Sequence, residues 1–273
     1  MDLDYEIWDV FTDAPYSGNP LAVFAEAPDL TTAAMARIAG ELNLSETVFI
    51  RRAEGANAFA MRILTPQTEL PFAGHPTIGA ALCLRARGEA TDGLVFHLQA
   101  GETPVAFEGA RAFLTAPAAP SRLAIECDRA TAAALLGLAP EDVIEVAGVE
   151  AGVAFTAAAL ASRAALARAE LSSPVWRERF AASPAPQIYA YFAETPERLH
   201  SRMFAPAFGI EEDPATGGAA VAMAALLPPG RYEIRQGEDM GRPSRLELIA
   251  GDPVRLGGAA VRIGAGALVA PEN

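Results

Sequence analysis

The stretch ELPFAGHPTIGAA (69–81) decides the fold and raises the question of function. It leads from a polar turn into a run of small residues that begins at Pro76. Proline suits the first turn of a helix, because an N–H group there has no partner within the helix. Gly88 closes the pattern, so the sequence predicts a helix from Pro76 to Arg87. His75, one of three histidines in the chain, stands at its N-terminus, either as a cap or as part of a site.

A second stretch echoes the first about half the chain later. The pattern HPxxGxA (75–81) returns as DPxxGxA (213–219), and both follow a strand pattern and open a helix of small residues. This repetition indicates a duplicated lobe with two helix N-termini in matching places, and it leaves open a shifted register between the two copies. Such ends bind carboxylates, and two that face each other would hold one small anionic substrate from both sides. Asp213 before proline is also a good N-cap, worth roughly 1 kcal/mol, and that alternative stays open.

Composition narrows the class of protein. The chain has 273 residues, 51% of them hydrophobic, and no apolar run of membrane-spanning length. A net charge of −13 without a basic stretch argues against nucleic acid and against an anionic membrane as partners. The N-terminus MDLDYEIWDV (1–10) is acidic and alternates like a strand, unlike a signal peptide, so we expect a cytoplasmic protein.

The residue inventory also limits the chemistry. Cys83 and Cys127 lie far apart and show no ligand spacing with the histidines, so we expect neither a disulfide framework nor a metal site. The chain contains no lysine, which excludes a pyridoxal-phosphate Schiff base and a lysine nucleophile. Carboxylates, imidazole, hydroxyls, thiols and the backbone remain available.

Three further groups are candidates for function. Glu46 heads the apolar strand of NLSETVFI (43–50), as an edge residue, the last turn of the preceding helix, or a general base in a dry cleft. GIEED (209–213) crowds three carboxylates, in a solvated turn or a partly buried one. Arg242 in GRPSR (241–245) lies in a surface turn or binds a carboxylate.

The remaining pattern predicts alternating strands and helices in two lobes. Prolines and alanines at 113–122 mark the boundary, giving lobes 1–116 and 117–273, with the last strand free to return to the first lobe. The principal predicted elements are strands at 3–12, 20–25, 187–194 and 201–206, a helix at 30–42 capped by Thr31 or Thr32, a helix capped by Asp128, a helix that ends at Pro228-Pro229-Gly230, and short strands with glycine turns over 246–269.

Taken together, these stretches resemble the PhzF family of phenazine-biosynthesis-like isomerases over essentially the whole chain. The ordered matches are DVFTDAPYSGNPLAVF (9–24), NLSETVFI (43–50), ILTPQTELPFAGHPTIGAA (63–81), RMFAPAFGIEEDPATGGAA (202–220) and QGEDMGRPS (236–244). The resemblance implies the α/β diaminopimelate-epimerase fold: two pseudo-symmetric lobes, each a curled sheet around a central helix, with the active site between them. It also implies a small carboxylate substrate, no cofactor, and a homodimer.

The resemblance also implies roles for particular residues. In the phenazine enzyme, the glutamate of the SET stretch moves a proton on a dihydro-hydroxyanthranilate ring in an allylic isomerisation, and Glu46 matches it. The family's GHP histidine and DPxTG aspartate line the site, matched by His75 and Asp213. Backbone N–H groups near Gly74 and Gly217 are expected to hold the carboxylate. Further substrate contacts are expected from Asn19, Ser45, Thr216 and Gly218.

Two departures limit the match. The phenazine enzymes usually carry serine where this chain has Gly218. The related epimerases use two cysteines as opposed acid and base, and their positions align with Ala73 and Pro214, so a two-thiol racemase is disfavoured. We therefore expect a cofactor-free isomerase with Glu46 as acid and base. The alternatives are a racemase or epimerase with a carboxylate and histidine pair, and a non-catalytic carboxylate-binding protein.

Overall fold

A computed structural model describes residues 2–271, which divide into two compact units. Unit 1 comprises the residues up to Pro117 together with those from Leu256 onward, and unit 2 comprises Ala118–Arg255. The residues from Leu256 onward thus group with unit 1. Among the residues described, no helix has both the length and the apolar character needed to cross a bilayer.

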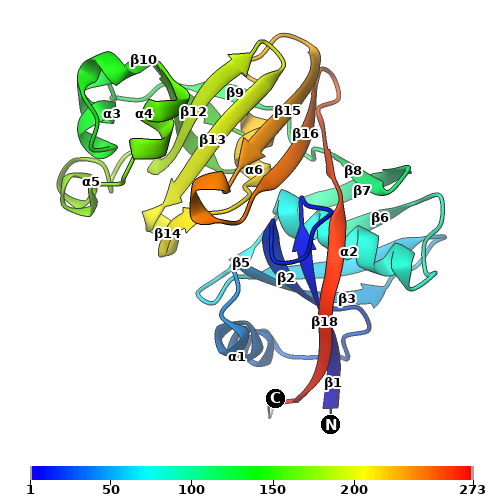
Figure 1. Cartoon of the computed structure of the whole chain (residues 1–273). Helices are drawn as coiled ribbons and strands as arrows, with labels where there is room; N and C mark the ends of the chain where they lie inside the picture. The colour runs from blue at the N-terminus through cyan, green and yellow to red at the C-terminus, as the bar shows by residue number, and fades with distance from the viewer. Residues whose placement is uncertain (1, 272–273) are drawn as a thin grey trace. The chain divides into compact units, whose positions relative to one another are not determined.

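The strands of unit 1 form a continuous ladder (Figure 1). β1 pairs antiparallel with β2 on one side and with β18 on the other. The ladder continues through β2–β3 (parallel), β3–β4 (antiparallel), β4–β6 (parallel), β6–β7 and β7–β8 (both antiparallel), while β5 pairs with the end of β4 and β17 pairs with β8. The bounds are β1 Asp2–Val10, β2 Asn19–Phe24, β3 Glu46–Arg52, β4 Ala58–Leu64, β5 Glu69–Leu70, β6 Gly93–Leu98, β7 Gly101–Glu108, β8 Arg111–Thr115, β17 Arg255–Gly258 and β18 Ala260–Val269.

The C-terminal tail follows its prediction only in its first part. Ser244–Ala250 and Arg255–Gly258 are short strands separated by a turn that begins at Gly251, but β18 runs unbroken through Gly264 and Gly266. Both glycines are paired in the ladder, with Ile7 and Tyr5 of β1. The ladder with β1 therefore overrides the tendency of these glycines to break the strand.

The central helix of unit 1 is α2 (Gly74–Ala86), and it is buried continuously from Gly74 to Leu84. A helix that is apolar on every side belongs in a core. It begins at Gly74, earlier than the predicted Pro76. A Cβ atom at Gly79 would lie 2.5 Å from Leu21 Cδ2 and 2.6 Å from Val10 Cγ2, so glycine allows the strands to pack directly on the helix.

The second helix of unit 1, α1 (Thr32–Leu42), confirms the predicted cap at Thr31. The Thr31 side chain accepts a hydrogen bond from the N–H of Ala34 and so satisfies one free donor of the first turn. α1 buries Ala34 and Ile38, among others, on the stripe that faces the core.

Unit 2 repeats the strand order of unit 1 around the helix α6 (Gly217–Met223). The shared order is a parallel pair, an antiparallel partner, a short strand that leads into the helix, a parallel strand and an antiparallel strand. Thus β2, β3, β4, β5, α2, β6 and β7 of unit 1 correspond to β11, β12, β13, β14, α6, β15 and β16 of unit 2. The bounds are β11 Ala154–Leu160, β12 Gln187–Thr195, β13 Arg198–Ala205, β14 Ile210–Asp213, β15 Gly230–Gln236 and β16 Ser244–Ala250, with β9 Ser121–Leu123 and β10 Val143–Glu150 before them.

The two units share their order of elements, and the position of the helices gives a register shifted from that of the sequence echo. Helix position pairs the N-cap residues Ala73 and Thr216, then Gly74 with Gly217, and His75 with Gly218. His75 is thus the second residue of α2, whereas Asp213 is the last residue of β14. The dipeptides His75-Pro76 and Asp213-Pro214 are therefore not equivalent, because Pro76 lies inside its helix and Pro214 lies before its helix. By helix position, Thr216 rather than Pro214 is the counterpart of Ala73.

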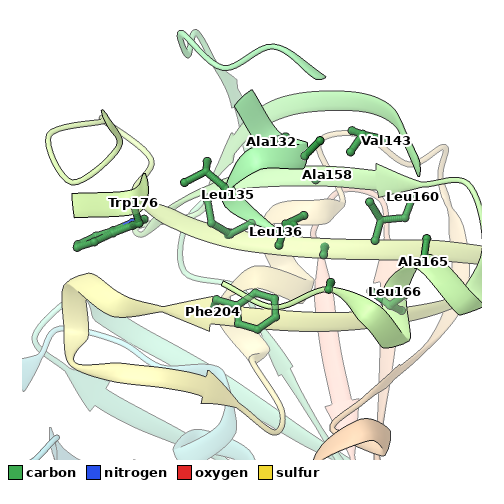
Figure 2. Close-up of a cluster of buried hydrophobic side chains, with 14 of the residues drawn as sticks. Ala132, Leu135, Leu136, Val143, Ala158, Leu160, Ala165, Leu166, Trp176 and Phe204 are labelled. Carbon is green, nitrogen blue, oxygen red and sulfur yellow. The ribbon is translucent and has the colours of Figure 1, made fainter. Parts of the chain in front are cut away.

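Three helices of unit 2, α3, α4 and α5, pack on the sheet through a cluster of alanine, leucine and aromatic side chains (Figure 2). α3 (Arg129–Leu135) has the predicted cap at Asp128, whose side chain accepts from Thr131 N. The helices that complete the unit are α4 Arg163–Arg168, α5 Ser173–Arg179 and the 3-10 turns η1 Pro140–Asp142, η2 Pro206–Phe208 and η3 Glu238–Met240. α6 ends at Met223, before the predicted stop at Pro228-Pro229-Gly230.

Candidate active site

In unit 1, two sequence-predicted residues come together. Glu46 is the first residue of β3 and His75 lies in the first turn of α2. The Oε2 atom of Glu46 and the Nδ1 atom of His75 are 2.9 Å apart, and their side chains are 15% and 3% exposed. A carboxylate and an imidazole in contact and shielded from water are suited to proton transfer.

The hydrogen-bonding capacity of this pair is unused within the part of the chain described. The 2.9 Å contact lacks the angles of a hydrogen bond, and neither Glu46 Oε2 nor either ring nitrogen of His75 has a hydrogen-bond partner among residues 2–271. Buried polar atoms normally have partners, so such orphans mark positions where a ligand or solvent is expected. The unpartnered atoms of Glu46 and His75 therefore mark a candidate position for binding a ligand.

Strand register explains why Glu46 faces the helix. Glu46 is paired with Leu21 of the parallel neighbour β2, and paired residues on adjacent strands point to the same face. Leu21 packs against α2 at Gly79, so the face that it shares with Glu46 is the helix face. Asn19 begins β2 and Ser45 immediately precedes β3, so both lie at the end of the parallel pair that carries Glu46.

The N-terminus of α2 has no side-chain cap. Its N-cap residue is Ala73, which makes no side-chain hydrogen bond to the helix, and Gly74 opens the first turn. The N–H groups of a first turn have no partners within the helix and carry the positive end of the helix dipole. Beside His75 there is thus a backbone environment that suits a carboxylate.

In unit 2, Asp213 is held in a network that was only partly predicted. The Thr216 hydroxyl donates to Asp213 Oδ2 at 2.5 Å. The side-chain amide of Gln236 donates to Asp213 O at 2.7 Å and to Thr216 Oγ1 at 2.9 Å, and it accepts from Thr216 N at 3.2 Å. The N-cap of α6 is Thr216, so Asp213 does not take the capping position that the sequence left open.

Gln236 is the residue that sequence reasoning missed. It is fully buried at the end of β15, although it lies within the quoted stretch QGEDMGRPS. The neighbouring glycine carried a signal: Gly237 has φ 73°, and a Cβ there would lie 2.7 Å from the carbonyl oxygen of Pro214. Glycine is therefore needed where the chain after Gln236 passes closely behind the Asp213 turn.

Gly217 and Gly218 form the first turn of α6, and packing does not require glycine at the second of them. A Cβ at Gly218 would meet only the Phe155 ring, at 3.8 Å, which is an ordinary contact.

The three crowded carboxylates of residues 209–213 are partly paired, because Glu212 forms a two-point ion pair with Arg202 at 2.8 and 2.7 Å. That hydrogen bonding raises the pKa of Arg202, so Glu212 serves structure.

Neither cysteine occupies a site position. Burial raises the pKa of Cys83 to about 12 and that of Cys127 to about 11. Cys83 lies inside α2 and Cys127 precedes α3, away from the helix N-caps Ala73 and Thr216. Across residues 2–271, no group of three or more His, Cys, Asp or Glu side chains is placed to hold a metal ion.

The chain is similar to known proteins over nearly its whole length. Residues 8–268 match the PhzC-PhzF family model, described as phenazine biosynthesis-like protein. The chain is 36% identical over 300 residues to an uncharacterized isomerase of Mesorhizobium japonicum, covering 97% of this chain and 98% of that protein. It is 36% identical over 253 residues to the trans-2,3-dihydro-3-hydroxyanthranilate isomerase of Pseudomonas chlororaphis, covering 88% and 87%.

Solved structures agree on the fold. A PhzF-family phenazine biosynthesis protein of Bacillus anthracis superposes with a TM-score of 0.86 at 22% identity, covering 98% of this chain and 99% of that one. The predicted diaminopimelate-epimerase-like fold is thereby confirmed. The names of the relatives favour an enzyme over the non-catalytic alternative, because both Pseudomonas proteins are named isomerases. The chain belongs to the PhzF family of phenazine biosynthesis-like proteins, and it is an isomerase.

Proposed function

We propose that this isomerase shifts a proton within a small carboxylate substrate without a cofactor, and that Glu46 is its general acid and base. The observation that carries the proposal is the contact between Glu46 and the buried His75, whose ring nitrogens have no hydrogen-bond partner among the residues described. The type of reaction follows the name of the Pseudomonas relatives, which isomerise trans-2,3-dihydro-3-hydroxyanthranilate.

The proposed reaction has two proton transfers. The Glu46 carboxylate takes a proton from a substrate C–H bond. The electron pair of that bond forms a new double bond to the neighbouring carbon, while the pair of the original double bond shifts to the far carbon. The protonated Glu46 then returns the proton to the far carbon of the allylic system, so the product is an isomer of the substrate. His75, whose Nδ1 lies 2.9 Å from Glu46 Oε2, stands beside the carboxylate and offers its ring nitrogens to the bound substrate.

The uncapped first turn of α2 supports the carboxylate part of the proposal. Negative charge that spreads toward the substrate carboxylate during proton removal would be stabilised by free N–H groups near Gly74. Asn19 and Ser45 lie at the strand ends that carry Glu46 and are proposed as further substrate contacts. For unit 2 we propose that Asp213 is the second functional side chain, held by Thr216 and Gln236, with Gly217 and Gly218 as backbone contacts.

The test is proton exchange in deuterated water, followed by mass spectrometry over a panel of small amino and hydroxy carboxylates. We expect Glu46→Gln to fold normally and to lose exchange on the order of 100-fold or more. Glu41→Gln, at an exposed position of α1, is the matched control and keeps full exchange. Unchanged exchange in Glu46→Gln would show that another group is the base.

Analysis of the product distinguishes the proposed isomerase from the remaining alternative, a racemase or epimerase. An isomerase moves a double bond, whereas an epimerase returns deuterium to the same carbon with inverted configuration. The expected homodimer and cytoplasmic location stay predictions, and light scattering on the purified chain measures the first of them.

A further inference from the structure

A buried amide in unit 2 has no assigned role in the proposed reaction. Gln187 is the first residue of β12 and is 1% exposed. Its Oε1 atom has no hydrogen-bond partner among residues 2–271. A buried acceptor without a partner is unfavourable, so one from outside the chain is expected.

The strand order makes Gln187 the counterpart of Glu46. Each is the first residue of its strand and is paired with a residue of the preceding parallel strand: Glu46 with Leu21, and Gln187 with Phe155. Leu21 packs against α2 at Gly79. The ring of Phe155 lies against α6, where it is the atom group nearest to a Cβ built on Gly218.

The same reasoning that directs Glu46 toward α2 therefore directs Gln187 toward α6. Paired residues share a face of the sheet, and Phe155 marks the face that the helix covers. In unit 1, the second residue of the helix is His75, which contacts Glu46. In unit 2, the second residue is Gly218, so the side chain that would occupy this position is missing.

Space is also available there. A Cβ at Gly218 would meet nothing closer than the Phe155 ring at 3.8 Å. Unit 2 thus pairs an unsatisfied buried acceptor with a helix position that has no side chain. The Asp213 carboxylate before the same helix favours a ligand group that donates hydrogen bonds or carries positive charge.

We propose that Gln187 is a binding residue that accepts a hydrogen bond from a hydroxyl or amino group of a small organic ligand, in the space left by Gly218. This inference does not depend on Glu46 being the base, since its test reads binding and not turnover.

The test is calorimetric titration of the full chain with three probes that differ by one group: benzoate, anthranilate and 3-hydroxybenzoate. The wild-type chain is expected to bind at least one of the two donor-bearing probes up to about tenfold more tightly than benzoate. Gln187→Met is expected to abolish this preference while leaving the affinity for benzoate unchanged. Gln67→Met, the same change at an exposed position, is the control and keeps the preference.

A second variant guards against misfolding of the first. Gly218→Val places a side chain in the proposed space and is expected to remove the preference as well. The inference is overturned if the preference survives in both variants, if both weaken all three probes equally, or if none of the probes binds the wild-type chain. It is also overturned if Gln187→Met changes only the unfolding midpoint, because the amide would then be satisfied by ordered solvent alone.

Discussion

Replacing Gln236 with leucine removes the side chain that holds the Asp213 turn to the helix α6. The leucine has a similar volume, so the change deletes hydrogen bonds with little change in packing. Three bonds are lost: to Asp213 O at 2.7 Å, to Thr216 Oγ1 at 2.9 Å and from Thr216 N at 3.2 Å. Each contributes roughly 1 kcal/mol net, and the Thr216 N–H and the Asp213 carbonyl would lose a buried partner.

We therefore expect Gln236→Leu to lower the free energy of unfolding by about 3 kcal/mol. Urea unfolding of the full chain, followed by circular dichroism, measures this loss. Gln67→Leu, at an exposed position, is the control and is expected to change stability by less than about 0.5 kcal/mol.

The same variant tests whether the turn matters for activity. The Asp213 carboxylate keeps its bond from Thr216 but loses the support behind it, so we expect kcat/KM to fall on the order of tenfold to 100-fold. A loss of stability below about 1 kcal/mol would refute the account of the network. Full activity alongside the expected destabilisation would instead refute a functional role for the Asp213 turn.

Two more predictions concern α2 and the thiols. Gly79→Ala would place a Cβ 2.5 Å from Leu21 Cδ2, and we expect it to destabilise the chain by about 1–3 kcal/mol, measured by urea unfolding; an unchanged midpoint would mean that the helix and strands can separate at no cost. Because burial raises the pKa of Cys83 to about 12 and of Cys127 to about 11, iodoacetamide near neutral pH should label both slowly and leave activity intact. Rapid inactivation by the reagent would place a reactive thiol in the site.

Local signals in the sequence predicted the elements well where a cap or a regular alternation was present. Thr31 and Asp128 were identified as caps because a short oxygen side chain preceded a helical run, and both accept the expected bond. The last part of the tail was wrong because its glycines indicated turns, whereas pairing with β1, distant in sequence, determines the strand β18. Pairing partners across the chain cannot be read from a window of neighbouring residues.

In the candidate site, too, local motifs were readable from the sequence, and contacts between distant segments were not. Glu46 and His75 were predicted from motifs, and their contact at 2.9 Å depends on the register of β3 with β2, which a motif does not encode. Gln236 was missed because a single glutamine has no periodicity to reveal that it is buried. The sequence echo left the register between the two copies open, because a proline suits both the first turn of a helix and the turn before it.

The two units carry different residues at two equivalent positions, the helix N-cap and the first residue of the strand that follows the parallel neighbour. The helix N-caps are Ala73 and Thr216, so neither helix begins at a thiol. The strand-start residues are Glu46 and Gln187, so only unit 1 has an ionisable group there. If Glu46 removes and returns the proton, as we propose, both transfers occur on one face of the substrate. On this proposal we expect a proton shift along one face of the substrate in preference to inversion of a centre, and the product analysis tests that expectation.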